Sequence, residues 1–128
     1  MPAKFRGGLA DGMFITRGFE HCLILWPMQE WRLITEKLRE LSLMNADSRR
    51  LVRLFTSGAA DATADRLGRI LIPSSLREYA GLSDAAVVVG VLDRVEIWSR
   101  DAWSAERSTT EAEGAQIAEH LFSQGLRS

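Results

Sequence analysis

The segment ADRLGRILIP, residues 64–73, joins a charged, turn-like start to an aliphatic run. The run Ile70–Ile72 leads directly into Pro73, and a short aliphatic stretch bounded by turn residues predicts a buried strand. Asp65 and Arg69 stand four residues apart at the start of this strand. Because the far end of such a strand is held in the core, its near end can present charged side chains rigidly.

Length and composition set modest bounds on the fold. The chain has 128 residues, of which 46% are hydrophobic and 26% charged, as in an ordinary globular protein. We expect one compact domain or two very small ones. No apolar run approaches the ~20 residues that a membrane span needs, so no membrane partner is expected.

The N-terminal sequence and the cysteine content indicate the compartment. The start, MPAKFRGGLADG, lacks the apolar core of a signal peptide. The single cysteine, Cys22, cannot form a disulfide within the chain. We therefore expect a reducing, cytoplasmic location.

Charge is segregated along the chain. The formal net charge is −1, so the whole molecule has no general attraction for nucleic acid, and any DNA binding needs a local patch. Residues 48–77 contain six arginines and two aspartates, whereas residues 101–119 contain five acidic residues and one arginine. This pattern favours a basic and an acidic surface on different faces, whether or not either of them binds a partner.

The chain repeats itself with a period of 71–72 residues, which is the main evidence for its organisation. Each repeat predicts a short helix after its proline and then two strands joined by a charged turn. The strands are MFITR and CLILW in the first repeat, and AVVVG and RVEIW in the second. The matching residues are Pro2, Phe5, Arg6, Gly18, Leu25, Trp26 and Trp31, which correspond to Pro73, Leu76, Arg77, Gly90, Ile97, Trp98 and Trp103. Repeat-equivalent tryptophans favour core packing over base stacking.

Helical sequence lies between the repeats and after the second. PMQEWRLITEKLRELS has an apolar stripe, and Asn45 is a plausible N-cap for a second helix, ADSRRLVRLFTS. We divide the chain into a first repeat (1–28), a helical linker (29–57), a second repeat (58–102) and a tail (103–128). The tail is expected to be weakly helical around residues 111–122, and either mobile or packed only in an oligomer. The second linker helix is either an ordinary amphipathic surface helix or a row of basic side chains that lies along a DNA phosphate backbone. The candidate phosphate contacts are Arg49, Arg50 and Arg53 on this helix and Arg77 in the second repeat.

DRLGRILIPSSLR resembles the D-x-x-x-R signature of the MraZ family of bacterial transcriptional regulators, which are built from tandem domains of the SpoVT-AbrB type. PAKFR, CLILWPMQEW and VLDRVEIW also resemble the repeats of that family, so the resemblance covers residues 2 to about 103. It implies an α+β, β-rich barrel of two AbrB-like swapped-hairpin pseudo-repeats with intervening helices. Strands from the two halves would interleave in this barrel.

The resemblance also implies a function. The chain would be a repressor that binds short direct repeats of double-stranded DNA in the promoter of a cell-division and cell-wall gene cluster. It would act as a ring-like homo-oligomer in the cytoplasm, associated with the nucleoid. The first repeat lacks its own D-x-x-x-R signature and the strand that accompanies it, because residue 1 stands directly before PAKFR. We expect either that the gene starts upstream or that the protein naturally carries one signature.

The DNA-contacting residues implied by the signature are Asp65 and Arg69, with Arg66 where a lysine is common. Arg69 can pair bidentately with guanine O6 and N7, and Arg66 can neutralise a phosphate. Asp65 repels phosphate, so it is better suited to orient an arginine or to accept a backbone N–H in the turn. The alternatives are that Asp65 is only a turn residue and that Arg69 forms a salt bridge within the fold.

No residue pattern indicates an enzyme, a cofactor or a metal. His21 and Cys22 are adjacent, so on a strand they point to opposite faces, and Cys22 is expected to be a small buried residue. His21 and His120 lack metal-ligand spacing. Two other functions remain open: an antitoxin-type AbrB-like DNA-binding module, and an oligomeric scaffold that has lost DNA binding.

Overall fold

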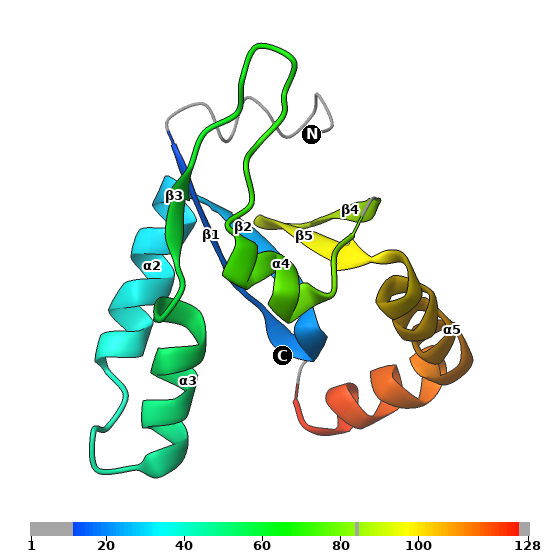
Figure 1. The fold of residues 1–128 in the computed structure, drawn as a ribbon. Helices are drawn as coiled ribbons and strands as arrows, with labels where there is room; N and C mark the ends of the chain where they lie inside the picture. Colours follow the sequence, from blue (N-terminus) through cyan, green and yellow to red (C-terminus); the bar gives the residue numbers. More distant parts are fainter. Residues whose placement is uncertain (1–11, 84, 126–128) are drawn as a thin grey trace.

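The strands predicted within each repeat form two hairpins of one sheet in a computed structural model, which describes residues 12–83 and 85–125 (Figure 1). The proline-led helix expected after residue 2 lies outside the described residues. The first repeat contributes β1 (Met13–Arg17), the short 3-10 helix η1 (Phe19–His21) and β2 (Leu23–Pro27), and the second contributes β3 (Ala60–Ala62), α4 (Ser74–Ala80), β4 (Ala86–Val91) and β5 (Arg94–Ser99). The remaining helices are α2 (Met28–Arg39), α3 (Ala46–Thr56) and α5 (Arg100–Ser123).

The order of the sheet interleaves the two repeats. The strands run β3-β1-β2-β5-β4, and all neighbouring pairs are antiparallel. A strand of the second repeat, β3, therefore lies beside β1 of the first, and β2 of the first repeat lies beside β5 of the second. The α+β class and the interleaving of strands are confirmed. The expected barrel closure is not, because β3 and β4 form opposite ends of an open sheet within the described residues.

The central ladder between β2 and β5 shows the internal symmetry of the chain. A shift of 72 residues exchanges the first and last pairs of this ladder and returns the middle pair to itself. A local two-fold axis therefore passes through the middle pair, and the repeat seen in the sequence is also a repeat in space. The three pairs are Leu23–Ile97, Ile24–Glu96 and Leu25–Val95.

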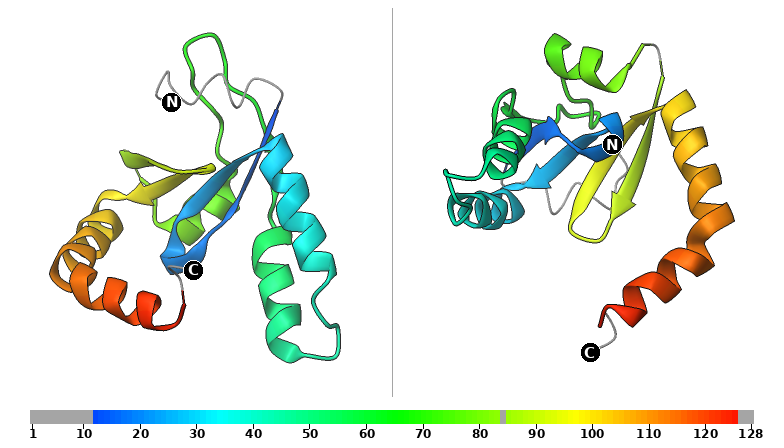
Figure 2. Two further views of the ribbon diagram at one scale, coloured as in Figure 1. Left: turned by 180° about the vertical axis from the view of Figure 1, so that it is seen from behind. Right: turned by 90° about the horizontal axis from the view of Figure 1, so that it is seen from below.

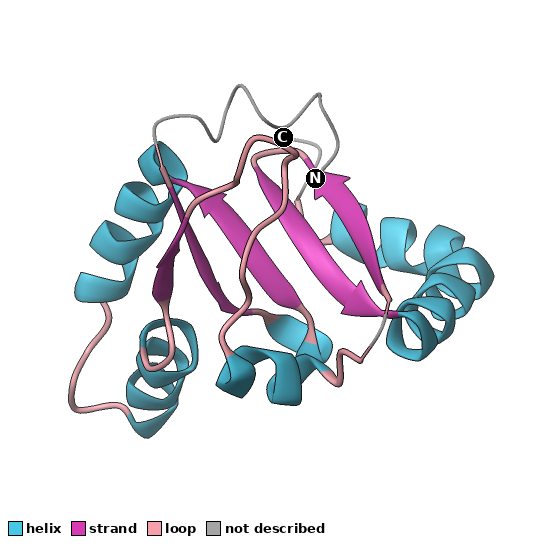
Figure 3. Cartoon of the chain, turned by 45° about the horizontal axis from the view of Figure 1, so that its top comes forward, coloured by secondary structure: helices cyan, strands magenta, loops and turns pink. Residues whose placement is uncertain are grey.

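Side chains alternate between two cores on opposite faces of the sheet. On one face, α4, the short helix predicted after Pro73, covers the sheet with Leu76 and Ala80. On the other face, Trp26 and Trp98 are buried with Leu38 of α2 and Phe55 of α3, and Trp31 and Trp103 pack against them. The interpretation of the four tryptophans as core residues is confirmed. Figure 2 and Figure 3 show α2 and α3 at one end of the sheet and α5 at the other.

The start of α3 follows the predicted capping. The Asn45 side-chain oxygen accepts hydrogen bonds from the backbone N–H groups of Asp47, at 2.8 Å, and Ser48, at 3.2 Å. These bonds satisfy donors that a helix N-terminus leaves without a partner in the helix. The N-cap prediction at Asn45 is confirmed.

Two local predictions differ from the structure. The run Ile70–Ile72 was predicted to be a buried strand, but it has no regular secondary structure. Ile70 and Ile72 pack against the core, whereas Leu71 is 86% exposed. The tail forms one 24-residue helix, α5, which is longer than the segment 111–122 expected to be helical. Its N-cap is Ser99, whose hydroxyl accepts the backbone N–H of Ala102 at 3.1 Å.

The helices in the described part of the chain are short or polar relative to a bilayer. None of them has the length and apolar character needed to cross a membrane.

Candidate nucleic-acid interface

The connection from β3 to α4 extends beyond the end of the sheet and carries the D-x-x-x-R segment (Figure 1). Asp65 organises this loop from within. Its Oδ1 accepts the backbone N–H groups of Leu67 and Arg69, each at 2.9 Å, and its Oδ2 accepts Nε–H of Arg69 at 2.8 Å. A single carboxylate thus caps the turn and holds the arginine, so both roles considered for Asp65 are present.

Two backbone hydrogen bonds also hold this loop closed. The N–H of Asp65 donates to the carbonyl of Arg69 at 2.8 Å, and the N–H of Gly68 donates to the carbonyl of Asp65 at 2.9 Å. Gly68 has φ +79° and is buried, so this tight turn favours a residue without a Cβ. The spacing of four residues between acid and arginine is therefore the length of this closed loop.

The electrostatics of the loop favour a fixed positive charge at its surface. The hydrogen bond from the Arg69 backbone N–H, together with the one from its side chain, lowers the pKa of Asp65 below its usual value. The carboxylate is therefore ionised near neutral pH. The Arg69 side chain remains 74% exposed although its Nε is bound, so the rest of the guanidinium faces solvent. A guanidinium held in this way is suited to bidentate recognition of a flat acceptor pair.

Arg66 and Leu67 form the exposed tip of the loop between the two ends of the signature. Within the described residues, no ion pair holds Arg66, so its charge is available to an external anion. Leu67 is a large apolar residue in a charged turn and was not among the candidates from the sequence. The one signal in the sequence was its place inside the signature. An exposed leucine beside two arginines can contact the apolar part of a base or sugar.

The loop stands over a groove against the sheet. The groove has a volume of about 380 Å³ and is bordered on one side by residues 67–70 and Ile72 and on the other by Leu25, Ile97, Ala86 and Val88. Its walls are largely aliphatic, so they support the base of the loop rather than offer it charged partners.

A cluster of polar contacts holds together the elements on either side of the loop. Arg17 donates from Nη1 to the backbone carbonyl of Ser57 at 3.1 Å and to its hydroxyl at 3.0 Å, and its guanidinium lies 5.6 Å from the ring centre of Tyr79. The Tyr79 hydroxyl donates to the carbonyl of Gly18 at 2.7 Å. These contacts tie the first repeat to the end of α3 and to α4, which flank the segment with the signature. Sequence analysis did not single out Arg17 or Tyr79 for this role.

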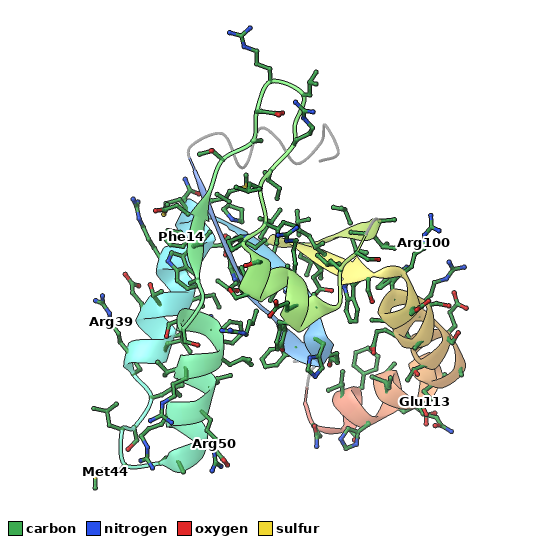
Figure 4. All side chains as sticks on the ribbon, in the orientation of Figure 1. Phe14, Arg39, Met44, Arg50, Arg100 and Glu113 are labelled. Carbon is green, nitrogen blue, oxygen red and sulfur yellow. The ribbon has the colours of Figure 1, made fainter. Side chains whose placement is uncertain are left out.

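The other predicted phosphate contacts are not gathered at the loop. Arg77 is exposed on α4, which directly follows the loop. Arg49, Arg50 and Arg53 lie on α3, and Figure 4 places Arg50 at the far end of the molecule from the loop. Arg49 donates to the carbonyl of Leu43 at 2.7 Å, and Arg50 lies 3.8 Å from the Asp47 carboxylate. Within one chain, the basic face of α3 and the signature loop are separate surfaces.

The residues considered for catalysis do not form a reactive site. Cys22 is 1% exposed, and burial raises the pKa of its thiol to about 12, as expected for a buried structural cysteine. Nδ1 of His21 lies 3.4 Å from the carbonyl of Tyr79. No group of three His, Cys, Asp or Glu side chains that could hold a metal ion occurs in the part of the chain that the structure describes.

Comparison with known proteins gives consistent matches along the chain. The family model described as "MraZ protein, putative antitoxin-like" matches it twice in succession, over residues 1–54 and 55–124, which confirms the internal repeat. The transcriptional regulator MraZ of Desulforamulus reducens is 46% identical over 94% of this chain and 85% of its own length. The protein of the same name from Clostridium beijerinckii is 44% identical over 98% of this chain and 88% of its own.

Proposed function

The chain belongs to the MraZ family, and on that basis we propose that it is a sequence-specific DNA-binding transcriptional regulator. The relatives described above are named transcriptional regulators. The observation that carries the proposal is the closed loop of residues 65–69, in which an ionised Asp65 holds an exposed Arg69.

We infer a separate role for each charged residue of the loop. Arg69 reads a base edge, with guanine as the preferred partner because O6 and N7 accept two parallel N–H bonds. Arg66 at the tip, together with Arg77 on α4, contacts phosphates and fixes the position of the loop along the duplex. Asp65 contacts no DNA and keeps the guanidinium of Arg69 oriented before DNA arrives.

The wider biological role is the one that the family resemblance implies. The protein represses a bacterial cell-division and cell-wall gene cluster by binding short direct repeats in its promoter, and it works in the cytoplasm at the nucleoid. It assembles into a ring-like homo-oligomer larger than a dimer, so that several loops engage neighbouring repeats at once. Two features support assembly: an open sheet, whose edges can accept partners, and two tandem repeats in each chain.

A gel-shift titration tests this proposal. The DNA is the promoter upstream of the protein's own operon, and the control is a scrambled duplex of the same composition, both at about 150 mM salt. We expect the promoter to bind at least about 1,000-fold more tightly than the control, as specific regulators do. Equal affinity for both duplexes, or no binding to either, would leave the oligomeric scaffold as the better account.

The antitoxin-type alternative is favoured by one specific observation, since the matching family model carries the words "antitoxin-like" in its description. Such a protein also binds DNA but pairs with a toxin through a disordered tail. The C-terminal segment here forms α5 through Ser123. Tight promoter binding by the protein alone supports the regulator, whereas promoter binding that depends on a co-purified partner protein supports the antitoxin.

A further inference from the structure

The second half of α5 leaves an apolar edge uncovered. Ile117, Leu121 and Phe122 are 44%, 41% and 49% exposed, and none of the residues of α5 is buried. In the first repeat, α3 packs together with the helix that follows the hairpin, α2, in a shared core. In the second repeat, α5 takes the place of α2, but beyond Trp103 no described residue of α5 joins either core.

Acidic side chains border this edge. Glu113 precedes Ile117 by four residues, so the two share one side of the helix at 100° per residue. Glu111 lies on the other flank of the edge and is paired with Arg107 at 3.0 Å. Glu119 follows Ile117 by two residues and precedes Leu121 by two, so it points away from both of these side chains. The exposed surface is thus an apolar stripe with carboxylates along its borders.

A groove of matching character lies between α2 and α3. It has a volume of about 430 Å³, and its apolar lining comes from Leu38, Leu41, Leu43 and Val52. Leu43 is 77% exposed, and the neighbouring Met44, at the turn between the helices, is 90% exposed. Leu43 and Met44 are adjacent, and exposed apolar side chains that form one patch are typical of contact surfaces.

Basic side chains border the groove, as acidic ones border the edge of α5. Arg39, at the end of α2, and Arg49, on α3, both line the groove. Arg50 is two positions from Val52 and points away from the groove, where it pairs with Asp47. The groove and the edge of α5 are therefore complementary in both apolar character and charge.

These two surfaces lie at opposite ends of the molecule. Figure 4 shows Arg39, Met44 and Arg50 on one side of the sheet and Glu113 on the other. They cannot meet within one chain in this structure, but the groove of one copy can receive α5 of another. Such a contact joins two different surfaces, so it is heterologous, and repeating it produces a ring when the rotation closes.

We propose that the C-terminal half of α5 from one copy docks in the α2–α3 groove of the next copy, with its carboxylates against Arg39 and Arg49. This is helix-in-groove recognition, in which Ile117 and Leu121 are the apolar anchors. The inference deepens the proposed oligomer and rests on it, but it does not depend on DNA binding. It also assigns the arginines that line the groove to protein contact rather than to phosphate.

Two charge reversals with matched controls test the contact. Glu113→Arg and Arg39→Glu should each weaken self-association at least about tenfold, because each places like charges together. Glu119→Arg and Arg50→Glu make the same charge changes on faces that point away, and they should leave association unchanged. The readout is light scattering coupled to size-exclusion chromatography over a range of concentrations, with thermal melts to confirm folding.

The combined variant separates a direct contact from a general loss of structure. Glu113→Arg with Arg39→Glu in one chain, or an equimolar mixture of the two single variants, should restore association. Leu121→Asp removes an anchor from an exposed position and should weaken association even if a charge variant fails to fold. Failure of the combined variant to recover, or normal association of Leu121→Asp, overturns the inference.

Three further outcomes keep this inference distinct from the proposed function. A wild-type protein that is monomeric at micromolar concentration overturns both the ring and this interface. An oligomer unaffected by either reversal overturns the interface alone. If Arg39→Glu assembles normally but loses affinity for a short duplex, the arginines that line the groove contact phosphate, and the α5 assignment is wrong.

Discussion

Replacing Asp65 by Asn isolates the orienting role of this side chain. The Asn Oδ1 can still accept the backbone N–H groups of Leu67 and Arg69, which now bond to Oδ1 of Asp65 at 2.9 Å. The amide Nδ2 replaces Oδ2, however, and it cannot accept Nε–H of Arg69. The turn is therefore retained while the arginine is released.

The expected effect on DNA binding follows from the freedom that Arg69 gains. Ordering a long side chain at an interface costs about 0.5–1.5 kcal/mol. In the wild type, the Asp65 contact meets part of this cost before DNA binds, so its loss should weaken binding by up to roughly 2- to 13-fold per engaged loop. Folding stability should change little, because the ion pair is exposed.

The comparison must remove the effect of charge, since loss of a carboxylate also reduces repulsion of phosphate. Asp61→Asn is the matched control, because Asp61 is exposed on β3 and lies outside the loop. Promoter binding is titrated for both variants at several salt concentrations. We expect Asp65→Asn to bind more weakly than Asp61→Asn at every salt concentration, with similar thermal melts. Equal affinity of the two variants would refute the orienting role.

Three further predictions concern the core. Gly18→Ala should destabilise the fold by about 1–3 kcal/mol in urea melts, because a Cβ there would lie 2.8 Å from both Sγ of Cys22 and Cγ1 of Ile24; an unchanged midpoint would contradict this packing. Thr16→Val should also lower the stability to urea, by about 1–3 kcal/mol, because Trp26 Nε1 loses its buried acceptor at 3.0 Å, and a neutral result would mean that this bond contributes little. The Cys22 thiol, with its pKa raised to about 12, should react with a thiol reagent at pH 8 only after unfolding, and fast labelling of the native protein would show that it is accessible.

Much of the fold follows from local patterns in the sequence. The hairpin strands have apolar runs, and the repeat equivalence of Trp26 and Trp98 predicts the core positions that both tryptophans occupy. The chemistry of Asp65 was predictable because a short carboxylate in a turn has few better partners than nearby N–H groups and an arginine.

Other features depend on partners that the sequence does not identify. β3 is three residues of small and acidic side chains, Ala60–Ala62, and it is a strand because β1 lies beside it. Conversely, the aliphatic Leu71 faces solvent, and its segment pairs with none of the strands that the structure describes. The length of α5 was underestimated because Gly114 weakens a helix only modestly, while Ser99 and the Arg107–Glu111 pair support it.

The separation of the two basic surfaces, the signature loop and α3, could not be predicted from the sequence. Arg53 and Arg66 are close enough along the chain to suggest one patch, but the loop and α3 extend in different directions from β3 (Figure 1). The number of charges in a segment does not show in which direction each part of that segment extends.

The most direct test of base reading by the loop is a comparison of Arg69→Ala and Arg66→Ala across a set of single-base operator variants. Arg69→Ala should lose about 5- to 160-fold in affinity for the native operator and become indifferent to one guanine, since a bidentate pair contributes about 1–3 kcal/mol. Arg66→Ala should weaken all sequences alike and flatten the salt dependence. If Arg69→Ala folds normally and still discriminates that base as the wild type does, the loop does not read DNA.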